Sequence, residues 1–480
     1  MNNNFETVIG LEVHAELNTK TKIFCGCENR FGAEVNTLCC PICMGLPGTL
    51  PVLNQQVVES AVKMGHALNC RINGVTKQDR KNYFYPDLPK AYQISQFDVP
   101  LCEGGYLDVL VGDEVRRIGV TRIHIEEDAG KLIHDDSFDG TLCDYNRCGV
   151  PLIEIVSEPD LRSADEAKAY LETITTILLY LGISDAKMQE GSVRCDVNVS
   201  VRPRGASEFG TRCEMKNVNS FGAVYRAIVY EAERQMEVLA AGGTIQQETR
   251  RWDDAKGKSI LMRSKEDAQD YRYFPDPDLL TFVVSDEKIA ALKASLPELP
   301  TAKTLRYVKE FGLQKVDAQL LSVNKARADF FDSCAALGRC EAKTAANWIL
   351  GDIAKILNER RIEITDTALT PEHLADMIVL IGKGTISNTA AKTVLEEIME
   401  RDVDPAQVVK EKGLAQISDA SALSGIVDQV LADNPKAVAD YKKGKVNVAG
   451  FLVGQCMKAS RGQGNPATLR DMVTEAIEKL

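Results

Sequence analysis

Between Ser192 and Arg202 apolar and polar residues alternate without a fault, and this run constrains the fold more than any other feature of the sequence. A two-residue period places successive side chains on opposite faces of a β-strand. The apolar positions are Val193, Cys195, Val197, Val199 and Val201, and the polar positions are Ser192, Arg194, Asp196, Asn198, Ser200 and Arg202. We therefore expect a strand with one buried face and one polar face.

Three further segments have polar faces of the same mixed kind. They are Thr7–Leu17, with Glu12, His14 and Glu16 on one face, Arg212–Lys216, and Ile118–Asp128, which ends in an acidic cluster. Such faces are usually only the solvated side of an antiparallel sheet. Here His, Asn, Ser and Arg mixed with Asp and Glu also supply ligands for Mg²⁺ and donors for phosphate, so the pattern indicates a metal and phosphate site.

Two close pairs of cysteines lie in the segment 25–43. Cys25-Gly-Cys27 is followed after twelve residues by Cys40-Pro-Ile-Cys43. This spacing is typical of a tetrahedral Zn²⁺ site, and four thiolates leave no open position for chemistry. We expect a structural zinc loop with Cys39 as a spare thiol; the alternative is a set of buried thiols without a metal.

The first part of the chain has a β-rich character, because short alternating runs are separated by Gly, Pro, Asn and Asp. Two helices interrupt it. One is expected from Ser163, which forms a capping-box pattern with Glu166, as far as Gly182. The other is expected to start after Ser220 and to stop at the Gly242-Gly243 pair.

Helical periodicity replaces the strand pattern around residues 296–300, and Thr370-Pro371 and Asn465-Pro466 mark helix starts beyond that point. A charged stretch at 410–413 indicates a further break. A length of 480 residues favours about three domains. We predict an α+β protein with a β-rich domain at 1–295, an all-α helical domain at 296–410 and a small all-α tail at 411–480.

The composition excludes several classes of protein. With 57 Lys and Arg against 69 Asp and Glu, the net charge of −12 excludes a uniformly basic nucleic-acid binder. No apolar run reaches the roughly 18 residues of a membrane span, and the start has no basic segment followed by an apolar core. Fourteen cysteines are far too few for a disulfide scaffold, so we expect reduced thiols and a cytoplasmic protein.

The tail is a basic island in this acidic chain. Residues 436–470 contain seven Lys and Arg and one Asp, a net charge of +6. Beside a Gly-rich loop at Arg461, such a face is suited to the phosphates of an RNA backbone. The alternative is an ordinary solvated helical face.

Two segments, 79–93 and 270–275, interleave aromatic residues with cations and amides. Such a mixture suits stacking on a base and binding of phosphate, although a well-packed loop has the same composition. No Walker A loop is present: Gly257-Lys258-Ser259 lacks the earlier glycine, because Trp252 occupies its place. Any nucleotide is therefore bound by another kind of fold.

Long blocks of the sequence resemble the signatures of the B subunits of tRNA-dependent amidotransferases. The blocks are Glu6–His14, Asp79–Asp87, Ala91–Gln96, His124–Gly130, Pro151–Asp160 and Asp270–Asp276. The resemblance continues to Phe451–Lys458 in the tail. It implies a cradle-type catalytic domain, a helical domain and a small helical tail that contacts tRNA.

The resemblance also implies an activity, that of an ATP-dependent carbon–nitrogen ligase. The family converts Glu-tRNA(Gln) or Asp-tRNA(Asn) to the amide form by phosphorylating the acyl carboxylate with ATP and then displacing phosphate with ammonia. Mg²⁺ is the expected cofactor beside the structural Zn²⁺. A glutaminase A subunit supplies the ammonia and a small C subunit completes a heterotrimer. The rival hypotheses are a noncatalytic tRNA-binding adaptor and a zinc hydrolase.

By this resemblance, site residues are expected in three sets. The expected Mg²⁺ ligands and catalytic residues are Glu12, His14, Glu127 and Asp196. The family pattern alone favours Glu127, since alternation would place Glu126 on the face of His124. The expected contacts to the nucleotide or acyl end are Lys81, Tyr83, Lys90, Arg194, Asn198 and Lys216, and those to tRNA are Lys442, Lys443, Lys445 and Arg461.

Overall fold

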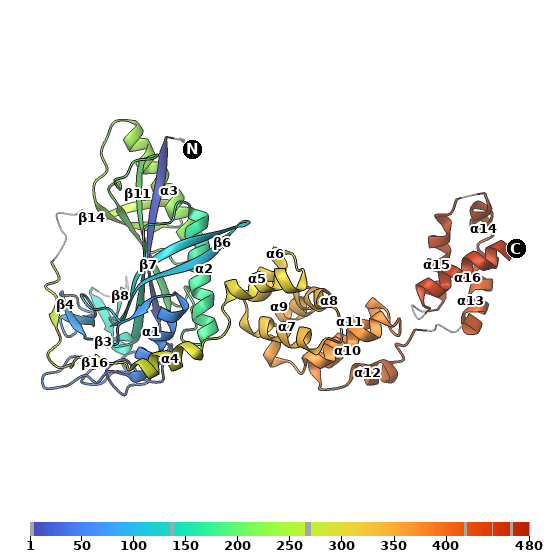
Figure 1. The fold of residues 1–480 in the computed structure, drawn as a ribbon, viewed down its shortest axis with the longest axis horizontal. Helices are drawn as coiled ribbons and strands as arrows, with labels where there is room; N and C mark the ends of the chain where they lie inside the picture. The colour runs from blue at the N-terminus through green and yellow to red at the C-terminus, as the bar shows by residue number, and fades with distance from the viewer. Residues whose placement is uncertain are drawn as a thin grey trace. The chain divides into compact units, whose positions relative to one another are not determined.

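The computed structural model describes residues 4–134, 139–264, 270–416, 420–443, 445–460 and 464–479. The chain forms two compact units, Met1–Lys303 and Thr304–Leu480. The first is built on β-sheet and the second consists of helices (Figure 1). This confirms the predicted α+β class.

A nine-stranded sheet forms the centre of the first unit in the part of the chain that the structure describes. From edge to edge it contains β14 (Lys258–Ser264), β13 (Glu248–Asp253), β12 (Cys213–Lys216), β11 (Val193–Pro203), β1 (Phe5–Glu16), β10 (Pro151–Ser157), β7 (Glu114–Glu127), β6 (Cys102–Val111) and β2 (Arg71–Ile72). Only β12 and β13 are parallel neighbours in this sheet. The strand order places β1 between β11 and β10, so strands that are far apart in sequence lie side by side.

Three smaller sheets accompany the large one. They are β15 (Phe274–Pro275) with β4 (Asp79–Asn82) and β5 (Tyr92–Ser95), β16 (Phe282–Val283) with β3 (Val75–Thr76), and β8 (Lys131–His134) with β9 (Thr141–Asp144). The first of them joins the two aromatic segments found in the sequence, because Phe274 lies opposite Arg80. Short helices in the described part of this unit are η1 (Tyr145–Arg147) and α4 (Asp286–Ala294).

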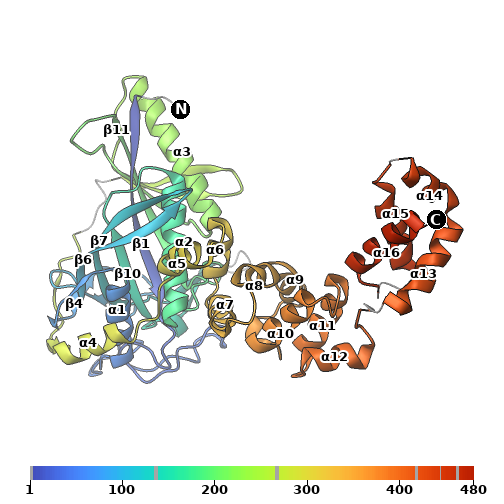
Figure 2. The same cartoon turned by 45° about the vertical axis from the view of Figure 1, so that its right-hand side comes forward.

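Three longer helices pack on the apolar face of the large sheet. They are α1 (Gln55–Ala67), α2 (Ala164–Leu181) and α3 (Phe221–Ala240). Their buried side chains share one hydrophobic core with the apolar positions of β1 and β11. Two views show α2 and α3 along the same side of the sheet (Figure 1, Figure 2). The opposite face carries the alternating polar side chains.

The ends of α2 and α3 agree with the sequence-based expectation. Ser163 Oγ accepts the hydrogen bond from the N–H of Glu166, and Gly182 ends α2 in the left-handed conformation. The carboxylate of Glu166 accepts from the N–H of Arg162, one residue before the cap. Ser220 caps α3 in the same way. Local capping chemistry thus sets these boundaries.

The second unit consists of helices. They are α5 (Pro300–Phe311, beginning in the first unit), α6 (Lys315–Ser322), α7 (Lys325–Leu337), α8 (Ala342–Trp348), the π-helical turn η3 (Ile349–Ile353), α9 (Ala354–Arg360), η4 (Ile364–Asp366), α10 (Pro371–Gly382), α11 (Asn388–Glu400), α12 (Pro405–Lys412), α13 (Ala420–Asp433), α14 (Pro435–Lys442), α15 (Val448–Ala459) and α16 (Pro466–Lys479). The expected starts of α10 and α16 are confirmed.

The described residues of the second unit form two separate hydrophobic cores. One contains buried residues between Tyr307 and Val409, and the other contains buried residues between Leu423 and Ile477. The compact units divide after Lys303, eight residues beyond the predicted end of the β-rich domain at 295. The division into three domains stays a prediction.

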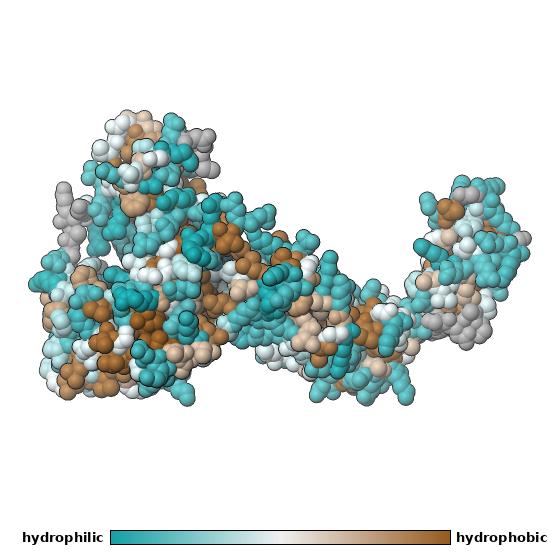
Figure 3. All heavy atoms as spheres, viewed as in Figure 1, coloured by the Kyte–Doolittle hydropathy of each residue, from teal (hydrophilic) through white to brown (hydrophobic). Residues whose placement is uncertain are grey.

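On the face shown in Figure 3, hydrophilic residues cover much of the surface, and hydrophobic residues gather in places among them. The most exposed large apolar side chains in the first unit include Phe31, Val52, Phe84 and Leu280. None of the helices among the described residues is long and apolar enough to cross a membrane.

Candidate active site

Strand pairing brings the polar faces of β7, β10, β1 and β11 into one continuous surface. His14 on β1 lies opposite Glu154 on β10 and Arg194 on β11. Glu154 in turn lies opposite His124 on β7. Glu12 lies opposite Asp196. Because neighbouring strands are less than about 5 Å apart, side chains of these rows reach one another.

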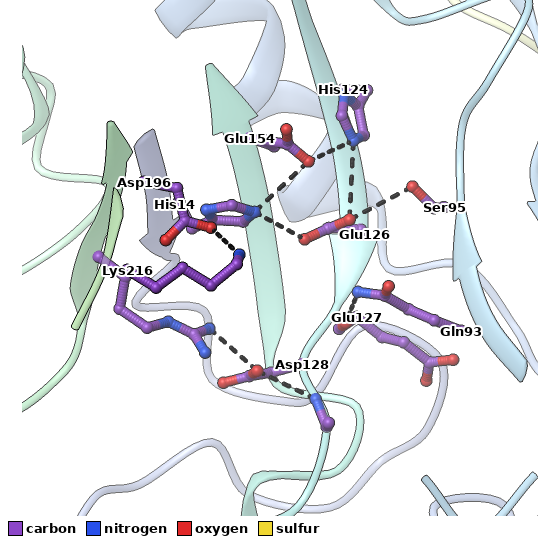
Figure 4. Close-up of polar contacts among 12 residues, drawn as sticks. His14, Gln93, Ser95, His124, Glu126, Glu127, Asp128, Glu154, Asp196 and Lys216 are labelled. Atoms are coloured by element: carbon purple, nitrogen blue, oxygen red, sulfur yellow. Dashed lines mark hydrogen bonds and ion pairs between the residues drawn. The ribbon is translucent and has the colours of Figure 1, made fainter. Parts of the chain in front are cut away.

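The first group of potential metal ligands contains His14, Glu126 and Glu154, whose ligand atoms all lie within 4.8 Å of one another. His14 Nε2 is 3.6 Å from Glu126 Oε1 and 3.4 Å from Glu154 Oε2. Burial would lower the pKa of His14, but Glu154 and Glu126 outweigh it and raise that pKa. The three side chains point toward one another, with His124 on the far side of the two carboxylates (Figure 4).

The second group contains Glu12, Asp196 and Glu214, again within 4.8 Å of one another. Lys216 Nζ is 2.5 Å from Asp196 Oδ2 and 2.9 Å from Glu214 Oε1. Asn198 Nδ2 donates to Glu12 Oε1 at 2.9 Å. Burial, followed by the charge of Glu154, raises the pKa of Glu12. The second group is thus rich in negative charge and has one ammonium group beside it.

Glu127 stands outside both groups. Its carboxylate accepts hydrogen bonds from Lys90 and from the N–H of Ile94, the latter at 2.9 Å. Glu126, and not Glu127, lies in one group with His14. Strand alternation pointed to Glu126, whereas the family pattern favoured Glu127. The other acidic residue of this strand end, Asp128, is held by Arg194 at 2.9 Å and by Arg147 at 2.6 Å.

Glu154 and Glu214 are members of the two groups that were not assigned from the sequence. Glu154 is the single charged residue of β10, a strand whose remaining residues are mostly buried. Glu214 stands between Arg212 and Lys216 in an alternating run. A lone carboxylate on an apolar strand is a signal that could have indicated Glu154, because an unpaired buried charge is unfavourable.

The six residues expected at the nucleotide or acyl end fall in three places. Lys216 and Asn198 touch the second group, whereas Arg194 and Lys90 hold Asp128 and Glu127. Lys81 Nζ lies 4.8 Å from the ring centre of Tyr271 and 5.9 Å from that of Tyr83. Burial lowers the pKa of Lys81, but the charge of Glu126 and its other neighbours outweighs burial, and the pKa is raised. Lys81 is therefore a cation near the first group.

Two cavities adjoin the second group, and Glu12, Asn198 and Arg212 line both of them. The larger has a volume of about 230 Å³, and apolar side chains line much of it. They are Val8, Leu11, Val156, Pro159 and Phe209. The smaller, of about 170 Å³, is lined by charged and polar residues that include Arg263 and Glu214. One end of this space is thus apolar and the other is polar.

The four thiols expected to bind zinc lie together, with all four Sγ atoms within 4.8 Å of one another. Cys43 Sγ is at the centre, 3.4 Å from Cys25 Sγ and 3.7 Å from those of Cys27 and Cys40. The hydrogen bond from Cys25 lowers the pKa of Cys43 to about 4 against the effect of burial, and the charge of Lys22 contributes. This cluster could bind a structural zinc ion.

The remaining sequence-based candidates lie in the tail or beside the thiols. Lys442, Lys443 and Lys445 are exposed, and Lys445 pairs with Asp440 at 3.3 Å. Arg461 lies outside the described residues. Cys39 is not a member of the four-thiol group, and its thiol donates to the carbonyl of Asn36 at 3.3 Å.

Comparison with known proteins gives concordant matches. The family model described as the GatB/GatE catalytic domain matches residues 7–290, and the one described as the GatB domain matches residues 329–477. The B subunit of the aspartyl/glutamyl-tRNA(Asn/Gln) amidotransferase of Caldicellulosiruptor saccharolyticus is 56% identical over 99% of this chain and 100% of its own length. The corresponding protein of Brevibacillus brevis is 54% identical over 99% of both chains.

A zinc ion held by the thiol cluster is expected to stabilise the loop 25–43. Four thiolates repel one another at this separation, so a cation is needed to hold Cys43 and its three neighbours together in the ionised form. A zinc chelator, or Cys43→Ser, should lower the thermal midpoint and make thiols of this cluster reactive toward a disulfide reagent. Cys340→Ser, at a half-buried thiol outside the cluster, is the matched control. An unchanged midpoint and unreactive thiols after chelation would contradict a structural metal.

Proposed function

Because the chain belongs to the family of B subunits of aspartyl/glutamyl-tRNA(Asn/Gln) amidotransferase, we propose that it holds the site where the misacylated tRNA is amidated. The reaction has two steps. A carboxylate is a poor electrophile, so the acyl carboxylate of Glu-tRNA(Gln) or Asp-tRNA(Asn) is first phosphorylated by ATP. Ammonia then attacks the activated carbonyl and phosphate leaves.

One observation carries this proposal: two groups of potential metal ligands meet on the polar face of one sheet. The carboxylates of both sets fit Mg²⁺, since it prefers oxygen ligands; one set has three carboxylates, and the other has two beside an imidazole. Bound there, Mg²⁺ would neutralise charge on phosphate oxygens during phosphoryl transfer. We propose Glu12, Asp196 and Glu214 as one set of ligands and His14, Glu126 and Glu154 as the other, with Glu126 in place of Glu127.

We place the nucleotide in the two cavities beside the second group. An apolar space beside Phe209 suits a base, and the polar space beside Arg212 and Arg263 suits phosphates next to the second group. Lys216 and Asn198, which touch that group, are in place to donate to phosphate oxygens. Lys81 and Tyr83, near Glu126, are proposed for the acyl end.

Ammonia has to come from elsewhere. The sequence contains no amidase signature, so we propose a glutaminase A subunit and a small C subunit as partners. Exposed Phe84 and Tyr85 in the signature block 79–87 are the kind of apolar surface that a partner covers. The cytoplasm is the proposed compartment, in keeping with fourteen free cysteines.

The tail is proposed to contact the tRNA. Its lysines at 442, 443 and 445 lie at and just beyond the end of α14 and are exposed, as phosphate contacts require. A noncatalytic tRNA adaptor is the alternative function. It predicts binding of tRNA without any consumption of ATP, so ATP hydrolysis that depends on misacylated tRNA separates the two.

Asp196→Asn is expected to lower formation of amide-tRNA by at least about 100-fold in the reconstituted complex, because it removes a ligand charge from the second group. Hydrolysis of glutamine should remain measurable. Asp108→Asn, which breaks an exposed pair with Arg117, is the control and should stay close to wild type. Analysis of the aminoacyl product with each misacylated tRNA gives the measurement, and normal amidation by Asp196→Asn would remove Asp196 from the site.

Arg212→Ala is expected to raise the KM for ATP about tenfold, as loss of one charge-assisted hydrogen bond of about 1.4 kcal/mol would do. The KM for misacylated tRNA should not change, and Arg212→Lys should recover part of the loss. Arg251→Ala, at an exposed position of β13, is the control. A raised KM for tRNA with an unchanged KM for ATP would instead assign Arg212 to the tRNA.

Replacement of Lys442, Lys443 and Lys445 by Ala should weaken tRNA binding and flatten its salt dependence, because fewer counterions are released. Binding measured at several salt concentrations gives the slope. The matched control replaces Lys343, Lys355 and Lys410, three exposed lysines elsewhere in the second unit. If the two triple variants have equal salt-dependence slopes, the tail lysines only form a solvated helical face and do not contact the tRNA.

A further inference from the structure

A second imidazole lies behind the first group of ligands. His124 is 3% exposed, and its Nε2 atom is 3.1 Å from Glu154 Oε2 and 3.6 Å from Glu126 Oε2. His14 meets the same two carboxylates from the other side (Figure 4). His124 is not among the ligands of either group. Two histidines thus flank the two carboxylates: His14 is a potential metal ligand, and His124 is not.

Occupation by a cation changes what each histidine can do. Nε2 is the nitrogen of His14 that faces both carboxylates. If a cation binds there, the lone pair of Nε2 goes to the ion, and Nε2 can no longer donate a hydrogen bond to Glu126 or Glu154. His124 Nε2 still can. Among the described side chains, Ser95 Oγ is the other donor to Glu126, at 3.3 Å, and Glu154 has only the two histidines as hydrogen-bonding or ion-pair partners.

The proton of His124 that matters is fixed by its surroundings. Both carboxylates face Nε2, whereas Nδ1 is buried without a hydrogen-bond partner among the described residues. Nε2 therefore carries a proton in the neutral ring and in the imidazolium alike. His124 thus offers the same donor to the carboxylates whatever the charge of its ring.

We propose that His124 is a positioning residue, which holds the carboxylates of Glu126 and Glu154 in the orientation that binds a divalent cation together with His14. The proposal rests on the function proposed above. Without a donor behind them, two carboxylates close together would turn apart or bind the cation through other oxygens. Partners of this kind behind ligands commonly change metal affinity by about 10- to 100-fold.

The test compares two replacements of similar size in the reconstituted complex. His124→Gln places an amide N–H₂ near the position of Nε2, whereas His124→Met has no donor. Mn²⁺ serves as the probe, with its binding measured by electron paramagnetic resonance. His124→Met should raise the dissociation constant of one class of Mn²⁺ site by about 10- to 100-fold, and His124→Gln should stay within about threefold of wild type.

Kinetics give a second measurement that loss of packing alone would not move. In His124→Met the Mg²⁺ concentration for half-maximal amidation should rise by the factor found with Mn²⁺, while kcat at saturating Mg²⁺ stays within about threefold of wild type. His373→Met is the matched control. His373 also has a buried, unpartnered Nδ1 and a carboxylate near Nε2, Asp402 at 3.3 Å, but lies in the other compact unit.

Three results would overturn the proposal. They are wild-type Mn²⁺ affinity in His124→Met, equal losses in His124→Met and His124→Gln, or the same loss in His373→Met. If His124→Met does not assemble, His124→Asn replaces it, because its shorter amide does not reach the place of Nε2. Absence of tRNA-dependent ATP hydrolysis in the wild-type complex would refute the proposed function, while Mn²⁺ binding would still report on His124.

Discussion

The pairing of β1 with β10 on one side and β11 on the other is the interaction on which the candidate site depends. These three strands come from residues 5–16, 151–157 and 193–203, so the chain has to close long loops before any ligand group can form. A shift of one residue in either register would turn every polar side chain of that strand into the core. The unbroken apolar face, buried under α2 and α3, opposes such a shift.

Much of this arrangement could be predicted from the sequence. Alternation assigned Glu12, His14 and Asp196 to polar faces, because the period of a strand is a local property. Which strands become neighbours is not local, so the row from His124 through Glu154 to His14 was not evident before the fold was known. The choice of Glu127 over Glu126 came from the family pattern alone, whereas alternation placed Glu126 on the face of His124. In the structure the carboxylate of Glu127 contacts Lys90.

The helical half shows the same division between local and distant effects. Capping residues such as Thr370 and a proline just after them mark where helices begin, and the structure follows these signals. No local signal says how the helices distribute their apolar faces. The charged stretch at 410–413 did indicate a break, and among the described residues one hydrophobic core ends at Val409 and the next begins at Leu423. In the thiol loop the spacing of cysteines was informative because a metal site restricts both ligand type and separation.

The environment of Cys43 contains a lysine with no access to solvent. Lys22 is 0% exposed, and its ammonium group donates to Cys43 Sγ at 3.5 Å. Four thiolates around one divalent cation carry two surplus negative charges, and a neighbouring ammonium offsets one of them. A relative that lost its cysteines while keeping this lysine would bury an unpaired positive charge. Substitutions of Lys22 and of the four cysteines should therefore occur together, with a neutral residue in place of the lysine wherever the thiols are absent.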